Sequence, residues 1–151
     1  MRALFVLGRT IFGGFFISNG LNHFLQQQSM RQYASSKGVP AAGAAVPATG
    51  AMLVAGGLSV LAGLKPREGL AAIVGFLIPV TLEMHRFWDE PDPNKRMVET
   101  VNFSKNLALI GAALALMQVE TPWPISVDER RADGEDMFVH LGGRDLRALP
   151  A

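Results

Sequence analysis

The chain contains no cysteine and few charged residues. Of its 151 residues, 18% are charged and 49% are hydrophobic, whereas an ordinary soluble domain carries about 25% charged residues. Without cysteine there is no disulfide framework, no thiolate nucleophile, no iron–sulfur cluster and no Cys-ligated zinc. The formal net charge of +1 gives no basic field, which argues against a nucleic-acid partner. Most enzyme classes that depend on sulfur are thereby excluded, and the length allows one domain.

Four long apolar stretches dominate what is present. A membrane helix needs about 20 mostly apolar residues to cross a hydrocarbon core about 30 Å thick, and four stretches meet this requirement. They are residues 4–24, 46–64, 70–88 and 101–119. The sequence therefore predicts an all-α fold. We expect an integral membrane four-helix bundle over residues 1–123, followed by a short polar extramembrane tail over residues 124–151.

Two other interpretations of these stretches fit less well. A cleaved signal peptide needs a small-residue cleavage site, but the first stretch runs into the polar sequence NHFLQQQ. Helices of a soluble bundle each show a polar face, whereas residues 46–64 and 107–117 are apolar or small all the way round. The many glycines also favour a membrane bundle, because small residues let helices pack closely in lipid.

The segments between the apolar stretches are predicted to be loops. Residues 25–39 are polar, residues 65–68 form a tight link with two basic side chains, and residues 89–100 carry two prolines and no apolar face. Four spans place both termini on one side of the membrane. Arg2 and the basic link favour cytoplasmic termini by the positive-inside rule, and we expect an integral membrane location.

Polar and ionisable residues gather near the ends of three spans. Ionisable groups within a membrane are costly, so they usually face the bundle interior and mark function. The predicted topology brings these residues to similar depth on the side opposite the termini, called here the loop end. The alternative is that they snorkel to the interface or serve packing alone. The candidate polar cluster consists of Asn19, His23, Glu83, His85, Arg86, Asn102, Lys105 and Asn106.

Charge pairing within this cluster can also be anticipated. A buried Lys105 or Arg86 needs a counter-charge, and Glu83 is the one acidic residue that the predicted spans place at the loop end. We therefore expect a buried Glu83–Lys105 or Glu83–Arg86 pair. Arg9 lies within the first span at the opposite end, as a structural intramembrane charge whose expected partner is Glu68 or Glu120.

The two histidines of the cluster do not have metal-ligand spacing. No HxxxH or ExxH pattern links His23 or His85 to a second ligand, so no metal site is expected. Whether either histidine ligates a pigment or a haem is left open by the residues.

Several motifs in fixed order resemble a known family. They are LGRTIFGGFFISNGLNHF in the first span, a tyrosine followed by KGVP in the loop, MLVAGGLSVLAGLKPREG, MHRFW and NFSKNLALIGAAL. Over about residues 2–118 the chain resembles the DoxX-like membrane proteins, and the tail after Trp123 lies outside the resemblance. The resemblance implies four-helix proteins of the bacterial inner membrane. The family takes its name from a small subunit of a thiosulfate:quinone oxidoreductase, and other members are partners in oxidoreductase or oxidative-stress assemblies, or chaperones.

From residues and resemblance together, we expect an accessory or structural subunit of a membrane redox or energy-converting complex. The polar cluster would lie near a quinone or lipid head group, and contact with a pigment is left open. No catalytic residue and no covalently bound cofactor are expected in this chain. Expected partners are membrane lipid and larger membrane-protein subunits. A stand-alone scaffold or assembly chaperone is the first alternative, and a small transporter or proton path is the second.

The polar tail raises a separate expectation. It is too short to fold on a core of its own, yet it contains an apolar patch formed by residues 137–139 and Leu141. We expect a larger partner subunit to cover this patch, because the four-residue link at residues 65–68 offers little surface for docking.

Overall fold

The computed structural model describes residues 2–134, and this part of the chain contains helices, turns and loops but no strand. The predicted all-α class is confirmed. Five helices are α1 (Arg2–Leu25), α2 (Gln27–Ser36), α3 (Ala42–Ala62), α4 (Pro66–Met84) and α5 (Pro93–Met117). A sixth, short helix covers residues 127–134.

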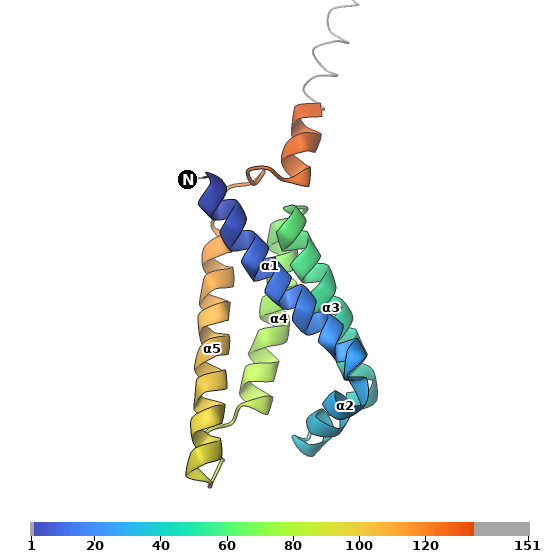
Figure 1. Ribbon diagram of the computed structural model, residues 1–151, viewed down its shortest axis with the longest axis vertical. Helices are drawn as coiled ribbons and strands as arrows, with labels where there is room; N and C mark the ends of the chain where they lie inside the picture. Colours follow the sequence, from blue (N-terminus) through green and yellow to red (C-terminus); the bar gives the residue numbers. More distant parts are fainter. Residues whose placement is uncertain (1, 135–151) are drawn as a thin grey trace, which may run out of the picture.

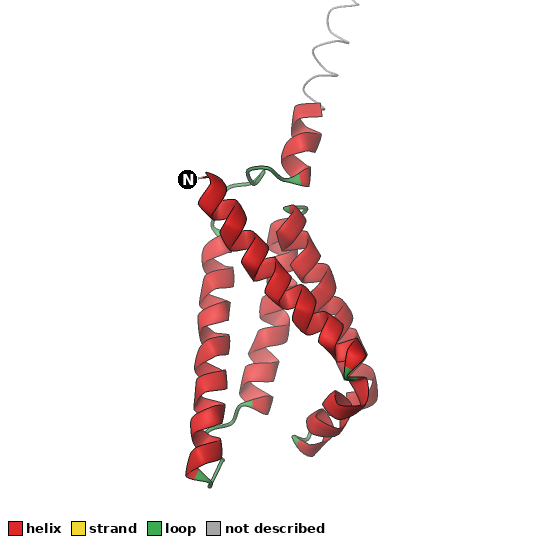
Figure 2. Cartoon of the chain, viewed as in Figure 1, coloured by secondary structure: helices red, strands yellow, loops and turns green. Residues whose placement is uncertain are grey.

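The four longer helices run between two ends of the molecule (Figure 1). The N-terminus, the α3–α4 connection and residues 118–134 lie at the terminal end, whereas α2 and the α4–α5 connection lie at the loop end. Helix α3 packs against α1, α2 and α4, and α5 packs against α4. Short loops join these helices (Figure 2).

Three of the helices are long and apolar enough to cross a membrane, namely α1, α3 and α5. The predicted third span, residues 70–88, is shorter than expected because α4 ends at Met84 and His85 adopts a non-helical conformation. Helix α4 has 19 residues and carries ionisable side chains at both ends. They are Arg67 and Glu68 near its N-terminus and Glu83 near its C-terminus.

Glycines set the close approach of α1 and α3. A Cβ atom added at Gly13 would lie 2.7 Å from the Gly57 carbonyl oxygen, and one added at Gly20 would lie 2.7 Å from that of Gly50. Both distances are too short for any side chain, so the two backbones touch. We call these four residues the glycine seam, and its close packing is of the kind that lets helices associate in lipid.

The terminal end is closed by residues that follow α5. Trp123 and Ser126 are fully buried, and the Trp123 ring meets Phe5 edge to face at 5.2 Å between centroids. Trp123 joins a core that fills the middle and terminal half of the molecule. The other buried members of this core are Phe16, Leu53, Val60, Leu70, Ile73, Leu77 and Ala113.

One expectation about the terminal end is wrong. Arg9 is buried, but its Nη2 donates to the Ile125 carbonyl oxygen, and within residues 2–134 it forms no ion pair with Glu68 or Glu120. The chain turns back over the helix ends after Trp123, which brings this carbonyl to the guanidinium. The start of the tail also docks on the short link, since the Lys65 N–H donates to Asp128 Oδ2 at 2.8 Å. The predicted patch at residues 137–139 and Leu141 lies outside the described residues.

Two predicted loops are partly helical. Residues 27–36 form α2, whose buried Ala34 packs with Ala42 and Val46 of α3. In the segment predicted as a solvated loop, α5 begins at Pro93. Asp92 caps it by accepting from the N–H groups of Asn94 and Lys95, and proline is well suited to the first helical position.

Candidate functional site

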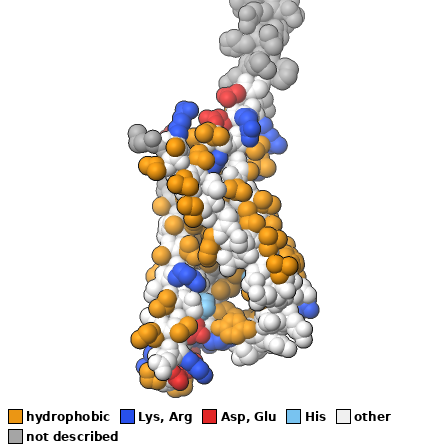
Figure 3. Space-filling view, in the orientation of Figure 1, with side chains coloured by type: hydrophobic (Ala, Val, Ile, Leu, Met, Phe, Trp, Pro, Cys, Tyr) orange, Lys and Arg blue, Asp and Glu red, His pale blue; other side chains and the backbone are white. Residues whose placement is uncertain are grey.

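A cavity replaces the packed core at the loop end. Its volume is about 510 Å³, within the range of small-molecule sites. All five labelled helices contribute to its wall, and Val39 and Pro40 of the α2–α3 connection lie beside it. The space-filling view shows this face hollowed near the loop end, between α2 and the lower part of α5 (Figure 3).

Most of the cavity wall is apolar and flexible. Aromatic rings come from Phe15, Phe16 and Phe76, and thioether side chains come from Met30, Met52 and Met84. Methionine adapts its shape to a ligand more readily than branched side chains do. A mostly apolar molecule therefore suits this wall.

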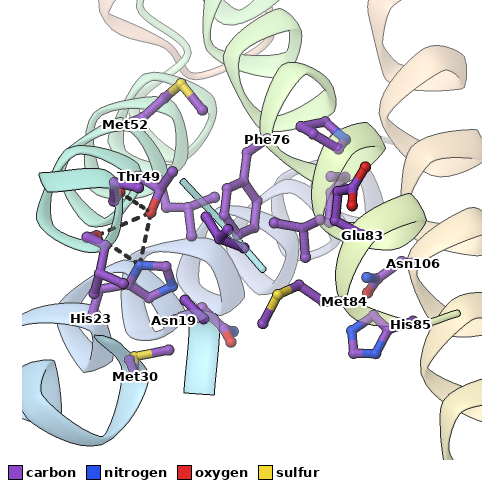
Figure 4. Close-up of a pocket in the computed structure, with 18 of the residues that line it drawn as sticks. Asn19, His23, Met30, Thr49, Met52, Phe76, Glu83, Met84, His85 and Asn106 are labelled. Atoms are coloured by element: carbon purple, nitrogen blue, oxygen red, sulfur yellow. Dashed lines mark hydrogen bonds between the residues drawn. The ribbon is translucent and has the colours of Figure 1, made fainter. Parts of the chain in front are cut away.

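Six residues of the predicted polar cluster line the cavity, and two do not. His23 and Asn19 lie on one wall with Thr49, whereas Glu83, His85 and Asn106 lie on the facing wall (Figure 4). Arg86 and Asn102 are absent from the lining. The six predicted residues that line the cavity are Asn19, His23, Glu83, His85, Lys105 and Asn106.

His23 is held by the backbone of α3. Its Nδ1 lies 3.0 Å from the Val46 carbonyl oxygen and 3.1 Å from Thr49 Oγ1, and its ring meets Phe76 at 5.8 Å. A carbonyl oxygen only accepts, so Nδ1 carries the hydrogen. Nε2 has no hydrogen-bond partner among the described residues, and Figure 4 shows the ring facing the cavity. An uncharged His23 therefore presents a hydrogen-bond acceptor to the cavity.

Behind His85 of the facing wall, a buried carboxylate joins three elements. Glu99 Oε1 accepts from Lys37 Nζ at 2.9 Å, and Glu99 Oε2 accepts from His85 Nδ1 at 2.7 Å. Lys37 follows α2, His85 follows α4, and Glu99 lies in the second turn of α5. We call these residues the Lys37–Glu99–His85 triad. Within residues 2–134, its Lys37–Glu99 hydrogen bond ties α2 to the α4–α5 side of the cavity.

The triad affects the charge of its members. The hydrogen bond to Glu99 raises the pKa of Lys37 above its ordinary value, despite some opposition from burial. Lys37 is therefore an ammonium throughout the physiological range, and it balances the charge of the Glu99 carboxylate. With His85 uncharged, the whole triad is neutral.

The predicted Glu83–Arg86 pair is present, but the prediction that this pair is buried is wrong. Glu83 pairs with Arg86 at 2.7 Å, but their side chains are 53% and 47% exposed, so this is a surface pair. Lys105 instead donates to Asn102 at 3.1 Å. The Glu83–Arg86 pair is exposed because α4 ends at Met84, which places Glu83 in its last turn and Arg86 beyond it.

The sequence alone missed the most buried ion pair, because it placed Glu99 in a loop. Asp92, followed by Pro93 and a helix-compatible run, is the signal that would have placed Glu99 in α5. Lys37 and Thr49 were also missed, since each acquires its role only when separate helices meet. Among residues 2–134, the structure brings together no group of three or more His, Asp or Glu side chains suited to a metal ion.

Comparison with known proteins adds the family. The DoxX family model matches residues 4–86, more than half of the chain. The chain belongs to the DoxX family. No curated protein and no solved structure matches it. The match covers the helices that carry His23, the glycine seam and Glu83, and it ends just before the segment that supplies Glu99.

Proposed function

We propose that this DoxX family chain is an integral membrane protein in which α1, α3, α4 and α5 all cross the bilayer. Its cavity would bind the head group of a quinone-type lipid, and the protein would serve as an accessory subunit of a membrane redox complex. In this role it holds the small molecule, while a partner subunit carries the electrons.

The cavity is the observation that carries the proposal. It lies at the loop end, near the depth at which a quinone head group meets the membrane interface. It combines an apolar, aromatic wall with a few polar groups on two facing sides. This is the usual make-up of a small-molecule site, and polar groups on two facing sides would suit a ring that carries two oxygen atoms.

The outer surface supports a membrane location. Apolar side chains extend along the visible face from one end to the other (Figure 3). Large hydrophobic residues exposed on α1, α4 and α5 include Leu4, Leu7, Ile11, Ile78, Leu82, Val101, Leu107 and Leu114. Such faces suit lipid tails or the helices of a partner subunit.

A cavity-filling variant tests ligand binding. Gly75 lines the cavity, and a Cβ atom added there meets nothing within 4 Å. Gly75→Leu should therefore fold and fill the site. Gly111→Leu is the matched control, because Gly111 has the same open surroundings but does not line the cavity.

The probes are trimethylbenzoquinone and trimethylhydroquinone, with binding measured by equilibrium dialysis of the protein in mild detergent. The proposal expects wild type and Gly111→Leu to bind at least one form, and Gly75→Leu to lose at least about tenfold in affinity. Absence of binding to both forms would overturn it. In that case, recovery of larger membrane subunits on purification would favour a scaffold or assembly role.

A further inference from the structure

Two imidazoles face one cavity, and each has its Nδ1 engaged by a protein acceptor. For His23 the acceptor is the Val46 carbonyl, and for His85 it is the Glu99 carboxylate. Neither acceptor carries a hydrogen to donate, so both Nδ1 atoms carry one. In the uncharged rings this leaves both Nε2 atoms with a lone pair and no hydrogen.

With His85 in that form, the charges of the triad balance. A carboxylate alone would favour a protonated imidazole, whose Nε2 is a donor. Glu99 already binds the Lys37 ammonium at 2.9 Å, so it does not need a second cation. Other charged groups nearby are the exposed Glu83–Arg86 pair at the end of α4 and Lys105 on α5. Glu90 and Lys95 lie close to Lys37 and Glu99, and Tyr33 lies beside Lys37.

Resting on the proposed function, we propose that this cavity selects the reduced, hydroxyl-bearing form of its ring ligand. The two Nε2 atoms accept hydrogen bonds from the two hydroxyl groups of a hydroquinone. A quinone offers only carbonyl oxygens, which accept and do not donate, so it finds no partner at either imidazole and depends on the Lys105 ammonium and the Asn106 amide of the wall. Glu99 is a positioning residue, because it acts on the ligand through His85.

The Glu99→Gln variant tests this role. The Lys37 ammonium can only donate, so the amide oxygen of the new side chain faces Lys37. The amide nitrogen then faces His85 and donates to its Nδ1. The hydrogen of His85 then moves to Nε2, which becomes a donor and suits a quinone carbonyl. The selectivity is therefore expected to change while the cavity keeps its shape.

Lys37→Gln should act in the same direction by a different route. It removes the ammonium and leaves the Glu99 charge unbalanced, which favours protonation of His85. Nε2 of His85 again becomes a donor. Asp89→Asn is the control, because Asp89 is an exposed carboxylate at the same end that does not line the cavity.

The measurement is the ratio of the affinities for trimethylhydroquinone and trimethylbenzoquinone, taken under anaerobic conditions near neutral pH. Wild type and Asp89→Asn should prefer the hydroquinone by about tenfold, as two added hydrogen bonds would give. In Glu99→Gln and Lys37→Gln the preference should fall to about threefold or less, with tighter binding of the quinone.

Each outcome of this measurement supports or overturns a stated part of the proposal. Equal affinities in wild type, or a preference for the quinone, would overturn the selection of the reduced form while leaving the cavity a quinone site. If Glu99→Gln weakened both forms by the same factor, Glu99 would be structural only, and its positioning role would be overturned. Binding of neither form would overturn the proposed function, and this inference with it.

Discussion

The two ends of this molecule are built in different ways. At the terminal end, Trp123 and Ser126 are fully buried, and one nitrogen of the buried Arg9 side chain donates to a backbone carbonyl. At the loop end, the five labelled helices surround a cavity, which the Lys37–Glu99–His85 triad reaches through His85. Side-chain packing stabilises the terminal end, whereas hydrogen bonds to the buried Glu99 carboxylate stabilise the loop end. Changes at the terminal end should therefore alter stability, whereas changes at the loop end should alter ligand binding.

The largest loss of stability is expected from Trp123→Ala. This side chain is fully buried against Phe5, and truncating a buried aromatic residue costs about 3–5 kcal/mol. Trp88→Ala is the control, because Trp88 is half exposed at the loop end and should cost under about 1 kcal/mol. Thermal unfolding in detergent measures both. Similar losses for the two variants would remove the contrast between the ends.

The glycine seam should be the next most sensitive feature. Gly13→Ala places a Cβ atom against the Gly57 backbone, which cannot move aside without separating α1 from α3. Overpacking of this kind costs about 1–3 kcal/mol. Gly14→Ala should be neutral or slightly stabilising, because nothing lies within 4 Å of its added Cβ atom. The same thermal measurement compares the pair, and equal melting temperatures would contradict the seam.

A smaller loss of stability is expected from Glu99→Gln. One buried carboxylate binds two partners, but Lys37 is partly exposed, which reduces the contribution to about 1–2 kcal/mol. Glu83→Gln breaks only the exposed pair with Arg86 and should change stability by no more than about 0.5 kcal/mol. A larger loss of stability for Glu83→Gln than for Glu99→Gln would contradict the claim that Glu99 is the carboxylate that stabilises the loop end.

The smallest effect concerns the start of α5 and depends on pH. Hydrogen bonds from the Lys95 and Asn94 N–H groups lower the pKa of Asp92. Its capping contribution is therefore present above the ordinary aspartate pKa and is lost as the pH falls through the lowered value. In wild type, the protection of the Asn94 and Lys95 amides against hydrogen exchange, relative to the intrinsic rate at each pH, should be lost only at that low pH. In Asp92→Ala this protection should be absent at every pH, and unchanged protection would contradict the cap.

The long helices could be predicted from the sequence because each contains a long, mostly apolar run. The glycines also indicated close helix packing, although only the structure shows that Gly13 meets Gly57 while Gly14 faces outwards. The helix α2 could not be predicted in this way. It has no apolar run, and its stability comes from a few contacts with α3, such as that of Ala34.

Only part of the candidate site could be predicted from the sequence. Helix direction alone brings His23, His85 and Asn106 to one end. The triad depends on where α5 begins, and two prolines with several charges made residues 89–100 look like a loop. Tail docking at Trp123 and Arg9 was equally hidden, because it depends on a contact between residues more than a hundred positions apart.

The most direct test of a ring-binding cavity at the loop end is to locate the bound ring. An azido derivative of benzoquinone can be photo-crosslinked to the full chain in detergent, reduced to the hydroquinone before illumination, and mapped by mass spectrometry. Labels are expected on the cavity residues Met52, Phe76 and Met84, with protection by excess trimethylhydroquinone. Labels confined to the terminal end, or labels that excess hydroquinone does not displace, would show that the cavity is not the binding site.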